Sequence, residues 1–182
     1  MGKDNAGEKD FSNRKELRLK KYDYSSTGAY FVTICVKDRM PILSHILKPV
    51  GGGALDAPQV QLTEIGRIIE KNLLSSENIS GVKIDRYVIM PDHIRAIIFL
   101  DSNKYIQRKN GSSKAPTPTN AVLPRVISAF KRFCNKEVGR SIFERGYYEH
   151  IVRDRADYET RIKYMYENPI YWCYNEAEKI IH

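Results

Sequence analysis

The stretch VKIDRYVIMPDHIRAIIFL (residues 82–100) has the clearest pattern of secondary structure in this chain. Two runs of β-branched, aromatic and other apolar residues, 82–90 and 93–100, flank a Pro-Asp pair that favours a tight turn. The pattern predicts two strands joined as a hairpin. Alternate side chains of a strand share a face, so His93 and Arg95 are expected side by side where the second strand begins.

The same kind of pattern predicts the remaining elements on both sides of this hairpin. They are a strand at 29–37, a helix capped by Thr63, a helix at 123–138, a strand at 147–153 and a helix from 155 to 168 that stops before Pro169. Two helical stripes should face a core: Val126, Ile127, Phe130, Phe133 and Cys134 in one helix, and Tyr158, Ile162, Met165 and Tyr166 in the last. A disordered tail at 1–13, a glycine-rich loop at 48–58 and a flexible basic linker at 101–120 separate or precede these elements.

The order of the elements is strand, helix, strand, strand, helix, strand, helix. This order is typical of an α+β, ferredoxin-like (split βαβ) fold with a four-stranded, mostly antiparallel sheet. Helices are expected on one face of that sheet, followed by a C-terminal helix that carries several tyrosines. Residues 14–182 are therefore expected to form a single domain after the tail.

Composition narrows the classes of function. The formal net charge is +8 over 182 residues, which favours a polyanionic partner such as nucleic acid, although a merely basic surface is the simpler alternative. The three cysteines are scattered and read as reduced thiols, and the N-terminus has no signal-peptide pattern. No apolar run approaches the length of a membrane span, so we expect a cytoplasmic protein without a membrane partner.

Two groups of residues could carry chemistry. If Arg95 were a histidine, the pair at 93 and 95 could bind a divalent metal ion. A guanidinium cannot bind a metal ion, so the plainer interpretation is that His93 has a structural role. On the last helix Asp157, Arg161, Tyr164 and Asn168 follow spacings of four, three and four and share a polar face. A solvated helix face with a surface tyrosine is the alternative there.

Several segments, in order along nearly the whole chain, resemble the REP-associated tyrosine transposases, which belong to the single-tyrosine HUH transposases acting on single-stranded DNA. The most specific are YVIMPDHIRAIIF (87–99) and KYMYENPIYW (163–172), which hold the Y-V-I-M-P-x-H hairpin and the Y-x-x-x-N-P helix motif. The resemblance implies the ferredoxin-like fold that the order of elements also predicts.

The resemblance also implies roles for individual residues. Tyr164 would be the nucleophile that forms a 5′-phosphotyrosine, and His93 and Asn168 would bind a divalent ion, Mg²⁺ or Mn²⁺. The second histidine of the family pattern falls on Arg95, so metal binding and activity are expected to be weakened. The basic residues expected to bind DNA are Arg14, Lys15, Arg18, Lys20, Lys21, Arg125, Lys131, Arg132, Lys136 and Arg161.

The expected function is therefore that of a metal-dependent transposase that cleaves and rejoins single-stranded or hairpin DNA, associated with the nucleoid and either monomeric or homodimeric. A catalytically inactive nucleic-acid-binding protein on the same fold is the alternative. An RNA-recognition module is disfavoured because strand 93–100 offers only Phe99 for base stacking. A small metal hydrolase would need a second cluster of acids or histidines, which the sequence lacks.

Overall fold

The computed structural model describes residues 27–48, 58–101, 104 and 122–179, with the backbone alone at 175–179. The tail 1–13, most of the predicted loop 48–58 and linker 101–120, and the five N-terminal basic residues from Arg14 to Lys21 lie outside the described residues. The elements are β1 (Gly28–Cys35), η1 (Lys37–Arg39), β2 (Ser44–Leu47), β3 (Gln59–Leu62), α1 (Glu64–Ser75), η2 (Ser76–Asn78), β4 (Val82–Ile89), β5 (His93–Leu100), α3 (Val122–Val138), β6 (Tyr148–Val152) and α4 (Arg155–Lys179).

Four strands form the main sheet in the order β4-β5-β1-β6, and every neighbouring pair is antiparallel. The predicted hairpin is β4 and β5, and its turn is closed by a hydrogen bond from the Met90 amide to the His93 carbonyl (2.8 Å). The order of strands and helices confirms the ferredoxin-like fold. It places β5 and β1 in the centre of the sheet, where both of their faces are covered.

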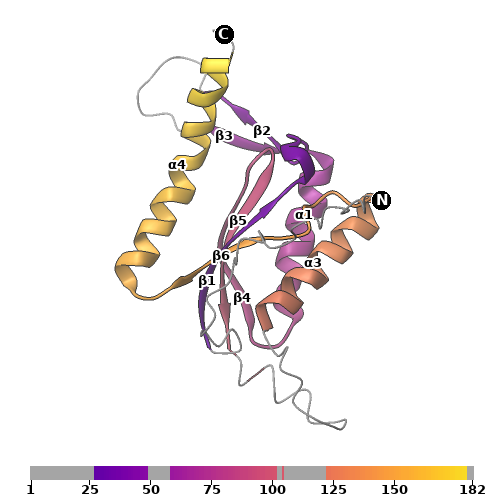
Figure 1. Ribbon diagram of the computed structural model, residues 1–182, viewed down its shortest axis with the longest axis vertical. Helices are drawn as coiled ribbons and strands as arrows, with labels where there is room; N and C mark the ends of the chain where they lie inside the picture. Colours follow the sequence, from indigo (N-terminus) through magenta and orange to yellow (C-terminus); the bar gives the residue numbers. More distant parts are fainter. Residues whose placement is uncertain (1–26, 49–57, 102–103, 105–121, 180–182) are drawn as a thin grey trace, which may run out of the picture.

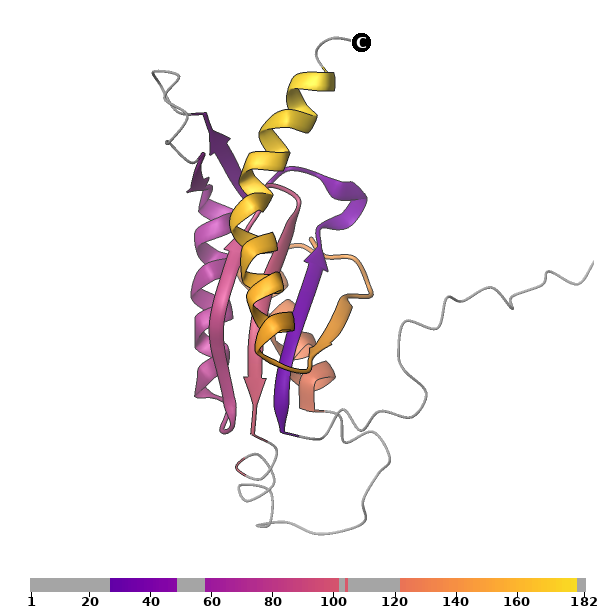
Figure 2. The same cartoon turned by 90° about the vertical axis from the view of Figure 1, so that its left-hand side faces the viewer.

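The two faces of the sheet are covered by different helices (Figures 1 and 2). α1 and α3 pack on one face, over alternate residues such as Val32, Ile94 and Ile98. α4 crosses the opposite face, where its Met165 packs on Phe31 and Ile97. Because β-strand side chains alternate, one central strand supplies both the main core and the platform for α4.

A short second sheet, β2 paired with β3, was not predicted from the sequence. Each strand has only four residues, too few for the alternation of side chains to stand out. The buried Ser44 hydroxyl donates to the Ile89 carbonyl (2.8 Å), which ties β2 to the end of β4. The Thr63 cap predicted for α1 is confirmed, since its hydroxyl accepts from the Gly66 amide (3.0 Å).

The prediction that the last helix stops before Pro169 is wrong, because α4 continues through this proline to Lys179. Proline removes one helical hydrogen bond and normally kinks or ends a helix. Here Pro169 is buried, and α4 contacts β4 and β2. Tertiary packing thus outweighs the local preference of the proline.

Two aromatic residues assigned to buried stripes are exposed. Tyr166 is 71% exposed, because eight residues of helix after Tyr158 turn it by about 80° away from the sheet. Phe133 is 52% exposed at the margin of the α3 stripe, with the Arg132 guanidinium 5.0 Å from its ring. The other predicted members of the α3 stripe are buried.

α4 is fixed at its first turns by two carboxylates. The Asp154 side chain accepts from the Asp157 amide (2.8 Å) and caps the helix. Asp85, at an irregularity in the β4–β5 register, accepts a hydrogen bond from the Tyr158 hydroxyl (2.5 Å). A bulge re-aims a strand side chain, and here it brings Asp85 to the helix. This hydrogen bond to Asp85 is the main cause of the raised pKa of Tyr158.

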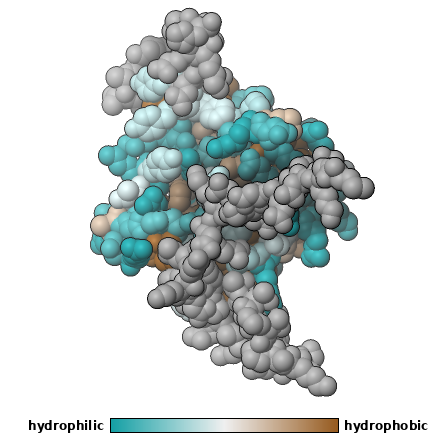
Figure 3. Space-filling model, in the orientation of Figure 1, coloured by the Kyte–Doolittle hydropathy of each residue, from teal (hydrophilic) through white to brown (hydrophobic). Residues whose placement is uncertain are grey.

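The surface seen in Figure 3 is largely hydrophilic where described residues are exposed, with smaller apolar areas between them. Within the described ranges, no helix is both long and apolar enough to cross a membrane.

Replacing Tyr158 by phenylalanine should lower the free energy of unfolding by about 1–2 kcal/mol, since a hydrogen bond to a charged partner is lost. Tyr166→Phe, an exposed tyrosine on the same helix, is the matched control and should change stability by less than about 0.5 kcal/mol. Urea unfolding of the two variants beside the unchanged protein measures both. Equal stability of the two variants would show that Asp85 does not hold α4.

Candidate functional site

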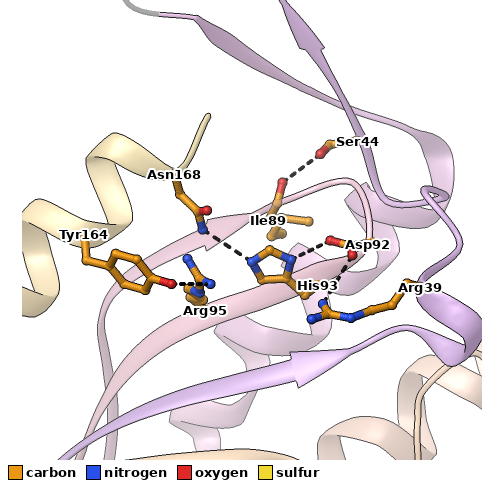
Figure 4. A network of polar contacts seen from close by, with 8 residues as sticks. All are labelled: Arg39, Ser44, Ile89, Asp92, His93, Arg95, Tyr164 and Asn168. Atoms are coloured by element: carbon orange, nitrogen blue, oxygen red, sulfur yellow. Dashed lines mark hydrogen bonds and ion pairs between the residues drawn. The ribbon is translucent and has the colours of Figure 1, made fainter. Parts of the chain in front are cut away.

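The site lies where β5 begins, on the face of the sheet covered by α4 (Figure 4). His93 pairs with Cys35 of β1 in the strand register, and Arg95 pairs with Thr33. The two side chains lie on one face, as the strand alternation predicts. α4 brings Tyr164 and Asn168 over them, one helical turn apart, so residues about 70 positions distant in sequence meet here.

A chain of polar contacts runs through the buried His93, which is only 5% exposed. Its Nδ1 is 2.5 Å from Asp92 Oδ1, and its Nε2 is 3.3 Å from Asn168 Nδ2. A neutral imidazole that donates from Nδ1 to the carboxylate accepts at Nε2 from the amide. Asp92 thus fixes which nitrogen of His93 presents its lone pair to α4.

Burial and charge keep this histidine neutral. Burial is the main cause that lowers the pKa of His93, and the Arg95 cation adds to it, while Asp92 acts in the opposite direction. Burial alone would raise the pKa of Asp92, but its hydrogen bond to His93 and the charges of His93 and Arg39 hold it below the ordinary value. Near neutral pH the pair is therefore a carboxylate and a neutral imidazole.

Arg39 reaches Asp92 from an unusual turn. Its Nη1 lies 3.2 Å from Asp92 Oδ2, and both Asp38 and Arg39 have positive φ angles, 55° and 53°. Left-handed backbone costs a non-glycine residue about 1–2 kcal/mol and is often found at functional sites. The turn η1 thus directs a second cation to the carboxylate that orients His93.

Tyr164 and Arg95 form the other half of the site. The Arg95 Nη2 donates to the Tyr164 hydroxyl (2.9 Å), and its Cζ lies 4.2 Å from the centre of the phenol ring. Tyr164 is 42% exposed, and its ring also lies 6.4 Å from that of Phe31. The hydroxyl expected to be the nucleophile is therefore accessible and held beside a fixed positive charge.

The basic residues predicted to bind DNA are divided between the two sides of the sheet. Arg161 lies on α4, on the same side as Tyr164, and its Nε pairs with Asp157 Oδ1 (3.0 Å). Arg125, Lys131, Arg132 and Lys136 lie on α3, on the opposite face. The Lys131 ammonium donates to the carbonyls of Glu144 (2.9 Å) and Gly146 (2.6 Å), and burial lowers its pKa. DNA would have to reach both sides to use all of them.

The residues present fit a resident divalent ion poorly. In the described part of the chain, no three His, Cys, Asp or Glu side chains are grouped closely enough to hold a metal ion. The predicted ligands His93 and Asn168 do lie together, but the third group of the site is the Arg95 guanidinium, which has no lone pair to donate and repels a cation. Metal binding remains a prediction, and the donor set supports only weak binding.

Two residues of the site were missed by sequence reasoning. The sequence pattern predicts only a turn at Asp92, although a carboxylate directly before a histidine is also a signal for a partner that orients the imidazole. Arg39 gives no such signal, because it reaches the site only through the left-handed turn before β2. Arg161 shares the polar face of the last helix with Tyr164, but it pairs with Asp157, and the Tyr164 hydroxyl accepts its hydrogen bond from Arg95.

We expect two substitutions to move the pKa of His93 in opposite directions. Asp92→Asn removes the carboxylate that favours the imidazolium and should lower this pKa further, whereas Arg95→Gln removes a nearby cation and should raise it. Titration of the histidine ring nitrogens by NMR measures both, with His93→Gln identifying the signal. Shifts of the same sign in both variants would contradict the assigned electrostatics.

The lowered pKa also predicts how stability depends on pH. Because folding favours the neutral form, the contribution of His93 is complete above its ordinary value of 6.5 and is lost as the pH falls through the lower folded value.

Comparison with known proteins gives two sequence relatives, both from Haemophilus influenzae, whereas no family model matches the chain. One, described as "Uncharacterized protein", is 33% identical over 180 residues, covering 88% of this chain and 90% of its own length. The other, described as "Putative REP-associated tyrosine transposase", is 30% identical over 93 residues, covering 50% of this chain and 51% of its own.

A solved structure has the same fold. It is a REP-associated tyrosine transposase bound to a REP hairpin, and it aligns with a TM-score of 0.56 and 17% identity over 84% of this chain and 73% of its own. The likeness of fold, the sequence relatives and the two motifs around His93 and Tyr164 agree with one another. This chain is thus similar in fold to a REP-associated tyrosine transposase and, over half of its length, similar in sequence to a putative one.

Proposed function

We propose that this protein binds single-stranded or hairpin DNA and cleaves and rejoins it through a 5′-phosphotyrosine on Tyr164. The observation that carries the proposal is the placement of the Tyr164 hydroxyl 2.9 Å from Arg95, one helical turn from the contact between Asn168 and His93. A nucleophile, a cation and an oriented imidazole thus meet on one face of a rigid sheet, which is where a phosphodiester could be held and attacked.

The proposed reaction is a transesterification. The Tyr164 oxygen forms a bond to phosphorus, the bond from phosphorus to the 3′ oxygen breaks, and that oxygen leaves as a 3′-hydroxyl with the proton released by the phenol. The reverse reaction, with a 3′-hydroxyl attacking the phosphotyrosine, rejoins a strand. One phosphodiester replaces another at each step, so the bond energy is kept and no ATP is needed.

The neighbouring residues have distinct proposed roles. The Arg95 guanidinium is placed to stabilise negative charge on the non-bridging phosphate oxygens. His93 is a positioning residue held neutral by burial and oriented by Asp92, and Asn168 links it to the helix of the nucleophile. His93 and Asn168 are the residues that would bind a divalent ion, which would supply Lewis-acid chemistry toward a phosphate, but the donor set supports only weak binding.

Charge supports DNA as the partner. The chain carries a net charge of +8, and α3 adds exposed cations on the face of the sheet opposite Tyr164. The similar transposase of known structure is bound to a REP hairpin, which supports a structured single strand as the substrate class. We therefore propose that the DNA end lies at Tyr164 while another part of the same molecule contacts basic residues outside α4.

The protein should bind a hairpin with a single-stranded extension more tightly than a blunt duplex of matched length. Its affinity should fall by about tenfold or more between about 50 and 200 mM salt, because phosphate contacts release counterions. Fluorescence anisotropy with labelled oligonucleotides measures both effects. Equal affinity for the two DNA forms would argue against a single-strand-specific function.

Tyr164→Phe should abolish the covalent protein–DNA adduct and leave DNA binding unchanged within about twofold, because it removes one exposed hydroxyl and keeps the ring. Tyr166→Phe, its exposed neighbour two residues away, is the matched control and should form the adduct normally. Denaturing gels with end-labelled DNA detect the adduct. An adduct that persists in Tyr164→Phe would refute the nucleophile, and DNA binding without any adduct in the unchanged protein would favour the inactive DNA-binding protein.

A further inference from the structure

Arg95, at the position where the family pattern has a second histidine, is a cation with no anionic partner among the described residues. Arg95 forms no ion pair with any residue that the structure describes, although it is partly buried. Its Nη2 is bonded to the Tyr164 hydroxyl, while its Nε and Nη1 are buried and find no acceptor among the described residues. Buried donors of a charged group are costly when left unpaired, so this arrangement favours an incoming anion.

We infer that Arg95 replaces the metal ion, so that its guanidinium binds a phosphate of single-stranded DNA beside Tyr164 without any divalent cation. This inference rests on the proposed function, because it names the group that holds the same DNA phosphate. A guanidinium offers parallel N–H donors that match two phosphate oxygens, and its charge does not depend on pH.

The carboxylate nearest to the site is already engaged elsewhere. Asp92 Oδ1 accepts from His93 and Asp92 Oδ2 pairs with Arg39, so both of its oxygens have partners. The other cation of this face, Arg161, is neutralised by Asp157. Among the described cations next to Tyr164, Arg95 is therefore the one whose charge these contacts do not neutralise. A phosphate would neutralise it.

The phenol ring acts as a cover for this cation. Its centre lies 4.2 Å from Arg95 Cζ, and we infer that the ring helps to bury Nε and Nη1, neither of which reaches solvent. Tyr164 is 42% exposed, so the inference includes an outward rotation of its ring when a phosphate binds the two donors, with the hydroxyl next to that phosphate. In the resting protein the ring thus occupies part of the space that the phosphate takes.

The test is binding of a thymidine trinucleotide, a probe too short to reach the α3 surface, measured by calorimetry in EDTA. The unchanged protein should bind it equally, within about twofold, in EDTA and with Mn²⁺. Arg95→Gln should weaken binding by about tenfold or more, and Arg95→Lys should also weaken it, because one ammonium cannot replace two parallel donors. Arg67→Gln, which removes an exposed arginine on α1 across the sheet, is the matched control and should bind normally.

Arg95→His gives the reciprocal result, because it restores a metal ligand in place of the cation. Its binding should be weak in EDTA and should recover when Mn²⁺ is added. Thermal unfolding of each variant shows whether the fold is kept, and Arg95→Lys keeps the charge if Arg95→Gln does not fold.

Three results would overturn the inference: Arg95→Lys and Arg95→Gln binding as well as the unchanged protein, binding by the unchanged protein only when Mn²⁺ is present, or no trinucleotide binding in either condition. The proposed function is judged separately, by hairpin binding and the Tyr164 adduct. Hairpin binding and adduct formation that require Mn²⁺ would refute the role of Arg95 and leave the proposed function standing.

Discussion

The packing of α4 against the open face of the sheet is the constraint on which the site depends. Met165 lies on Phe31 and Ile97 of the two central strands, and Tyr158 is bonded to Asp85 at the irregularity in β4. With Met165 against the sheet, helical geometry directs Tyr164 and Asn168 toward the start of β5. The same contacts that stabilise the last helix therefore set the distance between the phenol and Arg95.

The electrostatics of the site follow from one shared carboxylate. Asp92 orients His93 and pairs with Arg39, so both of its oxygens are engaged, and Arg95 has no counter-ion among the described residues. Burial and the Arg95 charge, acting against Asp92, lower the pKa of His93 and keep its imidazole neutral. A site built for a divalent ion needs several donors around an electropositive centre, whereas here the positive charge belongs to the protein itself. In the proposed site the Tyr164 phenol therefore lies beside a cation that the protein itself supplies, Arg95.

The sequence allows most of the fold to be predicted, because strands 82–90 and 93–100 and the apolar stripe of α3 have strong periodicities. The site could be predicted in part: strand alternation places His93 beside Arg95, and helical spacing places Tyr164 one turn from Asn168. The roles of Asp92 and Arg39 could not be predicted from the sequence, since they depend on the left-handed turn at Asp38 and Arg39. The continuation of α4 beyond Pro169 could not be predicted either, because burial of that proline outweighs its local tendency to end a helix.

The most direct test of the central claim is a crystal structure of the protein with a short single-stranded oligonucleotide, grown in EDTA. We predict a phosphate within hydrogen-bonding distance of Arg95 Nε or Nη1, with the Tyr164 hydroxyl positioned to attack its phosphorus. A phosphate bound instead on the α3 face, with the Tyr164 ring still over Arg95, would show that Arg95 does not bind the DNA phosphate.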